Sequence, residues 1–113
     1  MTQRAVDATL AALADPARRA VIDLLRRRPR RAGELADELA LSAPRMSQHL
    51  RVLRDGGLIE EIAVEDDARA RSYRLRREPF NALRGWLEDV EQFWSAQLDS
   101  FKEHAERKYR GRS

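Results

Sequence analysis

Apolar residues recur at helical spacing in the first part of the chain. Over residues 5–14 they recur in steps of three and four and predict a first helix, whose apolar face carries Val6, Leu10 and Leu13. Asp15 and Pro16 predict the start of a second helix, because aspartate is a favoured N-cap and proline is tolerated in a first helical turn. We expect this helix to end at Pro29 and to contain the apolar residues Val21, Ile22, Leu24 and Leu25.

Two further helices follow in close succession. Residues 32–40 predict a short third helix, and the turn Leu41–Ser42 leads into a fourth, for which Ser42 is a favoured N-cap. Gly56–Gly57 supplies a left-handed ending, and the buried face between these ends is expected to carry Met46, Leu50 and Leu53. Two short helices joined by a tight turn predict a helix-turn-helix over residues 32–56.

The periodicity changes after Gly57. Residues 58–64 are rich in β-branched side chains and residues 72–75 alternate polar with apolar, so they predict two strands joined by a polar loop over 65–71. We expect this hairpin to form a wing over residues 58–76. The predicted fold class is therefore mainly α with a small β-hairpin: a winged helix-turn-helix with four helices before the hairpin and one after it, in a single domain of 113 residues.

A long final helix is predicted over residues 79–104. Its apolar stripe consists of Phe80, Leu83, Leu87, Val90, Trp94, Leu98 and Phe101. The domain core offers no obvious place for the distal half of this stripe, so we expect a homodimer. The expected interface residues are Val6, Leu10, Leu13, Leu87, Val90, Trp94, Leu98 and Phe101. The alternative is that this helix folds back over its own domain. Residues 105–113 continue no stripe and are expected to fray.

The outward face of the fourth helix has the chemistry of a nucleic-acid reader. It carries Arg45, Ser47, Gln48 and Arg51, and arginine and glutamine pair bidentately with guanine and adenine edges. The net charge of +3 alone does not establish a polyanion partner, but all of the 22 basic residues except Lys102 and Lys108 are arginine, with a cluster at 26–31. This uneven distribution favours nucleic acid over a membrane surface.

Several other classes are disfavoured by composition. The chain has no cysteine, which excludes disulfides, thiol catalysis and thiolate metal sites. Its two histidines, His49 and His104, are far apart in the sequence, and its glycines form no phosphate-binding motif, so an enzyme is not expected. No stretch approaches the roughly 20 apolar residues of a membrane span, and the N-terminus lacks the apolar region of a signal peptide, so we expect a cytoplasmic protein.

Taken in order, several short motifs resemble the ArsR family of bacterial winged-helix repressors. The resemblance extends from about Ala11 to Phe101 and rests on Ala12-Leu-Ala-Asp-Pro-Ala-Arg-Arg19, Gly33-Glu-Leu-Ala36, Leu41-Ser42, Ser47-Gln-His-Leu-Arg-Val-Leu-Arg54, Gly57-Leu58-Ile59 and Tyr73-Arg-Leu75. It implies a homodimer, joined through its first and last helices, that binds a double-stranded DNA operator near its own promoter. Such a protein represses transcription until a signal weakens binding.

The chain departs from the metal-sensing members of that family. Those members often carry two cysteines in the third helix, where this chain has Leu35-Ala36-Asp37-Glu38. A metal site on the last helix would need paired carboxylates and histidines, but Asp99 lies five residues before His104 and so does not share its face. The chain therefore resembles the metal-independent branch, and we expect no metal and no cofactor. A metal-sensing repressor is retained as an alternative.

The expected DNA contacts lie in the fourth helix and the wing. They are Ser42, Ala43, Arg45, Ser47, Gln48, His49, Arg51, Arg69 and Arg71. Ala43 could touch a thymine methyl and Arg45 a guanine or a phosphate, whereas His49 could equally pack at the edge of the buried stripe. The two wing arginines either reach the DNA backbone or balance neighbouring carboxylates. The remaining alternatives are an interaction module without DNA binding and a nonspecific chromosome-coating protein.

Overall fold

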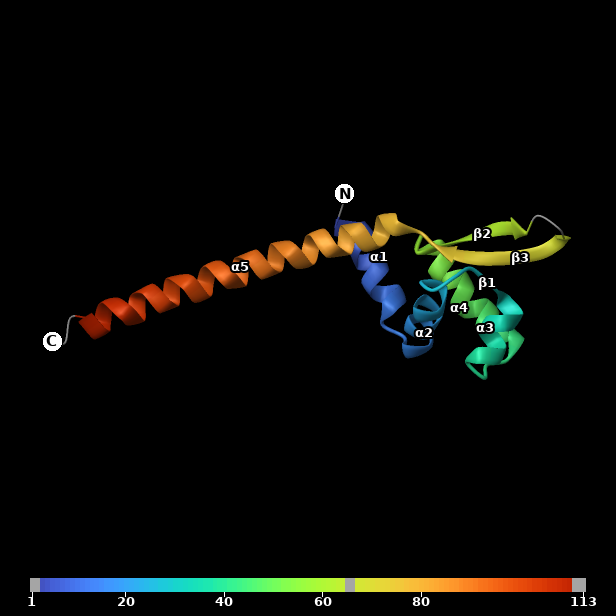
Figure 1. Cartoon of the computed structure of the whole chain (residues 1–113), viewed down its shortest axis with the longest axis horizontal. Helices are drawn as coiled ribbons and strands as arrows, with labels where there is room; N and C mark the ends of the chain where they lie inside the picture. The colour runs from blue at the N-terminus through green and yellow to red at the C-terminus, as the bar shows by residue number, and fades with distance from the viewer. Residues whose placement is uncertain (1–2, 65–66, 111–113) are drawn as a thin grey trace. The chain divides into compact units, whose positions relative to one another are not determined.

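The structure is a computed structural model that describes residues 3–64 and 67–110. Its elements follow in the order α1, α2, β1, α3, α4, β2, β3, α5, which confirms the predicted winged helix-turn-helix and adds one short strand (Figure 1). The chain divides into two compact units, and the boundary lies inside α5, between Leu83 and Arg84. Each unit is described by itself.

Helices α1 (Gln3–Leu13) and α2 (Pro16–Leu25) are separated by the predicted N-cap. The Asp15 carboxylate accepts hydrogen bonds from the amides of Ala17 at 2.7 Å and Arg18 at 3.3 Å. Desolvation acts to raise the pKa of Asp15, but these two amides, together with the positive charges of His49 and Arg18, bring it below its ordinary value. The helix ends at Leu25, four residues before the predicted stop at Pro29, and Arg26 is its C-cap.

Two arginines of α2 cap the preceding helix. The Arg18 guanidinium donates from Nε to the Ala12 carbonyl at 2.6 Å and from Nη2 to the Ala11 carbonyl at 3.3 Å. Arg19 donates from Nη1 to the Leu13 carbonyl at 2.7 Å. The last carbonyls of a helix have no partner within it and carry partial negative charge, so these contacts stabilise the C-terminus of α1 and fix it against α2.

Helices α3 (Ala32–Glu38) and α4 (Ala43–Asp55) form the helix-turn-helix, and both end in the same hydrogen-bond pattern. After α3, the amides of Ala40 and Leu41 bond to the carbonyls of Asp37 and Ala36, and Ala40 has a φ of 52°. A left-handed residue followed by this crossed pair of bonds is a Schellman ending. Alanine tolerates such a φ poorly, so the turn between the two helices holds local strain.

The end of α4 has the glycine that the end of α3 lacks. Gly57 has a φ of 76°, and its amide bonds to the Arg54 carbonyl while the Leu58 amide bonds to the Leu53 carbonyl. Gly56 has an ordinary φ of −77°, so only one of the two glycines supplies the predicted left-handed ending. The hydrogen bond of the Leu58 amide fixes the direction in which the chain leaves α4, and the first strand of the wing begins at the next residue, Ile59.

The sheet has three strands, where the sequence predicted two. β1 (Arg30–Arg31), β3 (Asp67–Leu75) and β2 (Ile59–Val64) lie side by side in that order and are antiparallel. β1 was not predicted because two residues carry no periodicity. The predicted loop over 65–71 is too long, because β3 already begins at Asp67, and the register with β2 shifts between Ala63 and Val64. Residues 65 and 66 of that loop lie outside the described residues.

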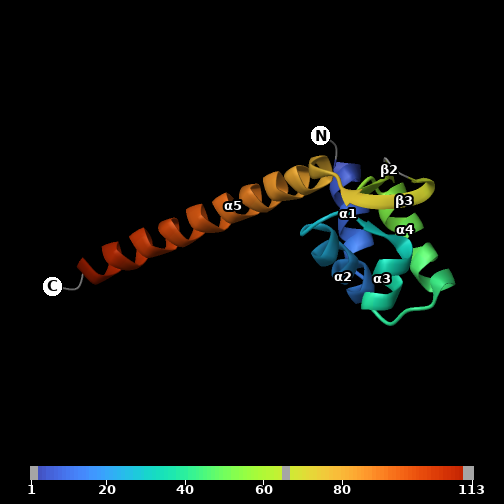
Figure 2. The same ribbon diagram turned by 45° about the vertical axis from the view of Figure 1, so that its right-hand side comes forward.

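The core of the first unit lies between the helices and one face of the sheet (Figure 2). It is built from α1, α2, α3, α4, the start of the wing and β2, with β3 and α5 contributing at its edge. Its buried members are Ala12, Val21, Leu25, Leu35, Ala36, Met46, Leu50, Leu53, Leu58 and Ile59. Partly buried Tyr73, Leu75 and Phe80 pack against them. The core therefore fixes α4 to both α3 and the wing.

Helix α5 (Arg77–Arg110) begins in the first unit and makes up the second. It continues past the predicted end at 104, because Ala105 and the charged residues around it are good helix formers. The last three residues of the predicted frayed tail, 111–113, lie outside the described residues. Within residues 3–64 and 67–110, no helix combines the length and hydropathy that a membrane crossing requires.

Candidate nucleic-acid interface

Helix α4 separates a buried face from a polar, exposed one. The three residues of its inward face, Met46, Leu50 and Leu53, are at most 3% exposed, which confirms the predicted buried stripe. Six of the predicted DNA-contacting residues are exposed, namely Ser42, Ala43, Arg45, Ser47, Gln48 and Arg51. The helix is thus held by one side and presents the other to solvent.

Ser42 has a structural role at the start of this face. Its hydroxyl accepts a hydrogen bond from the Arg45 amide at 3.3 Å, as the N-cap prediction requires. The turn before it is set by the left-handed Ala40. Backbone geometry at this end of α4 therefore determines where Ala43 and Arg45 lie.

The arginines of the outward face differ from several arginines elsewhere in the first unit. In the described part of the chain, neither Arg45 nor Arg51 lies within ion-pair distance of a carboxylate. By contrast, three arginines of the cluster at 26–31 are paired: Arg26 with Asp23 at 3.7 Å, Arg28 with Glu34 at 3.1 Å and Arg30 with Glu38 at 3.6 Å. The cluster is therefore weaker evidence for a polyanion partner than its sequence suggests.

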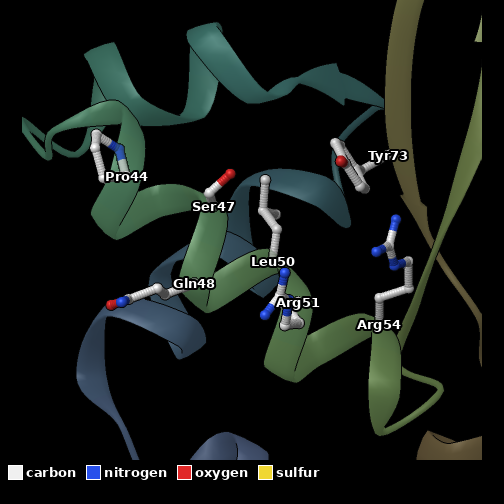
Figure 3. Close-up of a pocket in the computed structure, with 7 residues that line it drawn as sticks. All are labelled: Pro44, Ser47, Gln48, Leu50, Arg51, Arg54 and Tyr73. Carbon is white, nitrogen blue, oxygen red and sulfur yellow. The ribbon is translucent and has the colours of Figure 1, made fainter.

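A pocket of about 420 Å³ lies between α4 and the wing (Figure 3). Its lining comprises Pro44, Ser47, Gln48, Leu50, Arg51, Arg54 and Tyr73. Figure 3 shows Arg54 of α4 and Tyr73 of β3 extending toward one another, whereas Gln48 extends to the other side. Neither Arg54 nor Tyr73 was among the contacts predicted from the sequence. The spacing of Arg54 from Ser47 and Arg51 was the signal that could have found it.

His49 lies at the boundary between the two faces. Its side chain is half-buried, and its positive charge is one of the causes that lower the pKa of Asp15. This electrostatic contact connects α4 with the start of α2. Its half-buried position fits packing at the edge of the buried stripe, and a contact of His49 with DNA stays a prediction.

The wing carries Arg71 within β3, opposite Ala63 of β2. Arg71 is exposed and, two residues before Tyr73, lies on the same face of the strand. Arg69 is also in β3, but its side chain lies outside the described part of the structure. The predicted loop arginines are therefore strand residues.

Two of the three acidic side chains of α3, Glu34 and Glu38, are paired with arginines. Glu34 has its pKa lowered mainly by the hydrogen bond from Arg28, an effect that desolvation opposes and the Arg31 amide reinforces. Among the described residues, no three histidine, cysteine or carboxylate side chains are grouped so that they could hold a metal ion.

The residues expected at a dimer interface fall into two groups. Val6 is buried within the first unit, and Leu13 and Val90 are half-buried. The other five are exposed, namely Leu10, Leu87, Trp94, Leu98 and Phe101. Two exposed aromatics of α5 lie outside the predicted stripe: Trp86, and Phe93, whose ring meets that of Trp94 edge to face at 6.2 Å. Because these two fall beside the stripe, the apolar face is wider than predicted.

Comparisons with known proteins agree with this geometry. The family described as "Helix-turn-helix domain" matches residues 13–62. The HTH-type transcriptional regulator Rv2034 of Mycobacterium tuberculosis is 36% identical over 100 residues, covering 88% of each chain. The transcriptional repressor SdpR of Bacillus subtilis is 36% identical over 50 residues, covering 44% of this chain and 56% of its own.

A solved structure strengthens the same assignment. The crystal structure of an ArsR family transcriptional regulator is 32% identical, with a TM-score of 0.74, and the match covers 84% of this chain and 95% of that one. The relatives are transcriptional regulators and not enzymes. With the helix-turn-helix, the wing and these relatives in agreement, the chain belongs to the ArsR family of DNA-binding helix-turn-helix transcriptional regulators.

Proposed function

We propose that this protein is a sequence-specific repressor that binds, as a homodimer, to an operator near its own promoter. The observation that carries the proposal is the outward face of α4, which presents Arg45, Gln48 and Arg51 without a carboxylate partner in the described residues. Unpaired arginine and glutamine side chains are free to bond to base edges in the major groove. By contrast, three of the five arginines at 26–31 are paired with carboxylates.

The dimer rests on the exposed apolar face of α5. Leu87, Trp94, Leu98 and Phe101 are 51–73% exposed. A contiguous apolar face of this kind is characteristic of an interaction site, and a second copy is the occupant that a two-fold oligomer supplies. A dimer places two copies of α4 on one duplex, with half-sites about 10 base pairs apart or a multiple of that distance.

Repression is supported by the similarity to the repressor SdpR, which extends over 50 residues of this chain. A protein that occupies a site at a promoter excludes polymerase by its presence alone. Among the proposed contacts, Arg45 and Gln48 read bases, whereas Ser42 and Ser47 position the backbone. Arg69 and Arg71 of the wing contact the flanking backbone.

The experiment is a retention assay with DNA fragments from around the protein's own gene. The purified protein is expected to retain a fragment upstream of the gene at salt concentrations that release fragments of equal length from elsewhere. Arg45→Ala should relax the preference at one operator position per half-site, because one good bidentate contact contributes about 1–3 kcal/mol of discrimination. Equal retention of all fragments would refute the proposal.

A further inference from the structure

One flank of α4 carries a polar stripe parallel to its buried one. Ser47, Arg51 and Arg54 lie at i, i+4 and i+7, each one position after a residue of the buried stripe, so they share a flank of the helix. All three line the pocket between α4 and the wing, together with Tyr73. The lining includes two arginines and no carboxylate.

We propose that this pocket binds one phosphate of the DNA backbone. The guanidinium groups of Arg51 and Arg54 match the geometry of phosphate oxygens, and the hydroxyls of Ser47 and Tyr73 can donate to the same group. The inference rests on the proposed function, because α4 must lie on DNA for the pocket to be reached. A phosphate contact carries no base sequence, so the pocket sets position and affinity and leaves base preference to Arg45 and Gln48.

Glu61 competes with the phosphate for Arg54. Its Oε2 lies 3.4 Å from Arg54 Nη1, and Glu61 is the cross-strand partner of Tyr73, which places it beside the pocket. A carboxylate offers two oxygens much as a phosphate does. When DNA binds, Arg54 exchanges an intrachain carboxylate for a phosphate, so Glu61 lowers the affinity for every DNA sequence.

The neighbouring positions supply a matched control. Glu60 and Arg74 are the next residues along the two strands and therefore lie on the other face of the wing. Their ion pair is 2.5 Å long, and the side chains of Arg74 and Glu60 are 55% and 39% exposed, compared with 48% and 35% for Arg54 and Glu61. Glu60 also lies 3.8 Å from Arg76, so the control pair has a similar exposure but does not line the pocket.

The first test compares the two arginines. Affinities are measured for the upstream fragment and for a random duplex at several salt concentrations. Arg54→Ala is expected to weaken binding to both by roughly tenfold per half-site, the loss of one charge-assisted hydrogen bond. The slope of log affinity against log salt should fall by about 0.9 per half-site. Arg74→Ala should leave this slope unchanged, and Tyr73→Phe should give a smaller loss than Arg54→Ala for both duplexes.

The second test compares the two glutamates. Glu61→Gln and Glu60→Gln each remove one negative charge from the wing. An exposed ion pair contributes about 0.2–1 kcal/mol. Because Glu61→Gln frees Arg54, we expect this variant to bind both duplexes roughly 1.5- to 5-fold more tightly than Glu60→Gln binds them. In an Arg54→Ala background this excess should disappear. Melting curves by circular dichroism confirm that each variant is folded.

Three results separate the possibilities. Equal salt slopes for Arg54→Ala and Arg74→Ala would refute the phosphate pocket even where operator preference is intact. Inorganic phosphate at millimolar concentration and constant ionic strength should displace DNA from the unmodified protein more than from Arg54→Ala, whereas binding of phosphate at this pocket that leaves the DNA affinity unchanged would overturn the proposal in favour of a free anion. A smaller slope of log affinity against log salt in Arg54→Ala, together with no preference of the unmodified protein for the upstream fragment, would support the pocket and refute the proposed function.

Discussion

Helices α4 and α5 carry apolar stripes of the same spacing and opposite exposure. Met46, Leu50 and Leu53 of α4 are at most 3% exposed, whereas Leu98 and Phe101 of α5 are 64% and 73% exposed. The difference lies in what surrounds each helix. The first stripe is enclosed by α2, α3 and the wing, and the second lies in a unit built from one helix. Spacing therefore predicts that a helix is amphipathic but not what covers its apolar face.

Removing apolar volume from the two stripes should have unequal effects on stability. Leu53→Ala is expected to lower the free energy of unfolding by about 2–5 kcal/mol, because Leu53 is fully buried and its removal leaves a cavity. Leu98→Ala, measured by urea denaturation at the same low protein concentration, should cost under about 1 kcal/mol. Equal losses would mean that α5 is covered within one chain, which was the alternative left open by the sequence.

A charge on the α5 stripe should instead act on self-association. Trp94→Asp is expected to weaken the proposed dimer by at least roughly thirtyfold, since aromatic residues at the centre of an interface commonly contribute about 2 kcal/mol or more. Sedimentation velocity over a range of micromolar concentrations measures it. Gln92→Asp, also exposed but a half-turn away from Trp94, is the control and should leave association unchanged. A monomer in the unmodified protein would contradict the proposed dimer.

Substitutions at the left-handed residues before and after α4, Ala40 and Gly57, should change stability in opposite directions. Ala40→Gly is expected to raise the free energy of unfolding by about 0.5 kcal/mol, because relief of a left-handed alanine exceeds the added chain entropy of glycine. Gly57→Ala, with the same kind of φ, should lower it by about 1–2 kcal/mol. Thermal and urea denaturation measure both variants. Changes of the same sign would contradict the Schellman assignment.

As the pH falls, the first unit is expected to lose stability before self-association through the apolar stripe of α5 is affected. Both Asp15 and Glu34 have lowered pKa values, and both lie in that unit. A carboxyl whose pKa is lowered by folding contributes stability that is complete above its unfolded pKa of about 4 and is lost as pH falls through the folded value. The melting temperature should therefore drop between about pH 5 and pH 2.

The double variant Asp15→Asn, Glu34→Gln isolates this effect. It keeps a capping side chain at position 15 and removes both titrating groups. Its melting temperature is expected to depend less steeply on pH over the same range than that of the unmodified protein. An equally steep dependence would assign the acid sensitivity to other carboxyls.

The helices were predictable because their signals are local. Asp15–Pro16, Ser42 and Gly57 act within one turn, and the inward face of α4 follows from spacing alone. The same spacing, combined with residue chemistry, identified Arg45, Gln48 and Arg51 as exposed. These parts of the fold and of the site depend on residues close together in the sequence.

Features formed between distant segments were not predictable in this way. β1 exists only because β3 offers a partner, and β3 starts early because pairing with β2 compensates for weak strand propensity in 67–71. Arg54 of α4 and Tyr73 of β3 line the same pocket only after the chain has folded. The pairing of the arginines at 26–31 likewise depends on where Glu34 and Glu38 come to lie.

The central place of β3 has a consequence for the order in which the fold forms. β1 and β2 pair only with β3, and the first of these pairings joins Arg30 to Tyr73, 43 positions along the chain. At about 5–20 residues per second, a ribosome takes roughly 2–9 s to make the intervening chain. During that interval the helices already made can form from local contacts. The Arg30 guanidinium, which is buried in the folded protein, still lies in water at this stage. The pairing of β1 with β3 therefore forms after α1 to α4, and it completes the burial of a charge that the nascent helices leave hydrated.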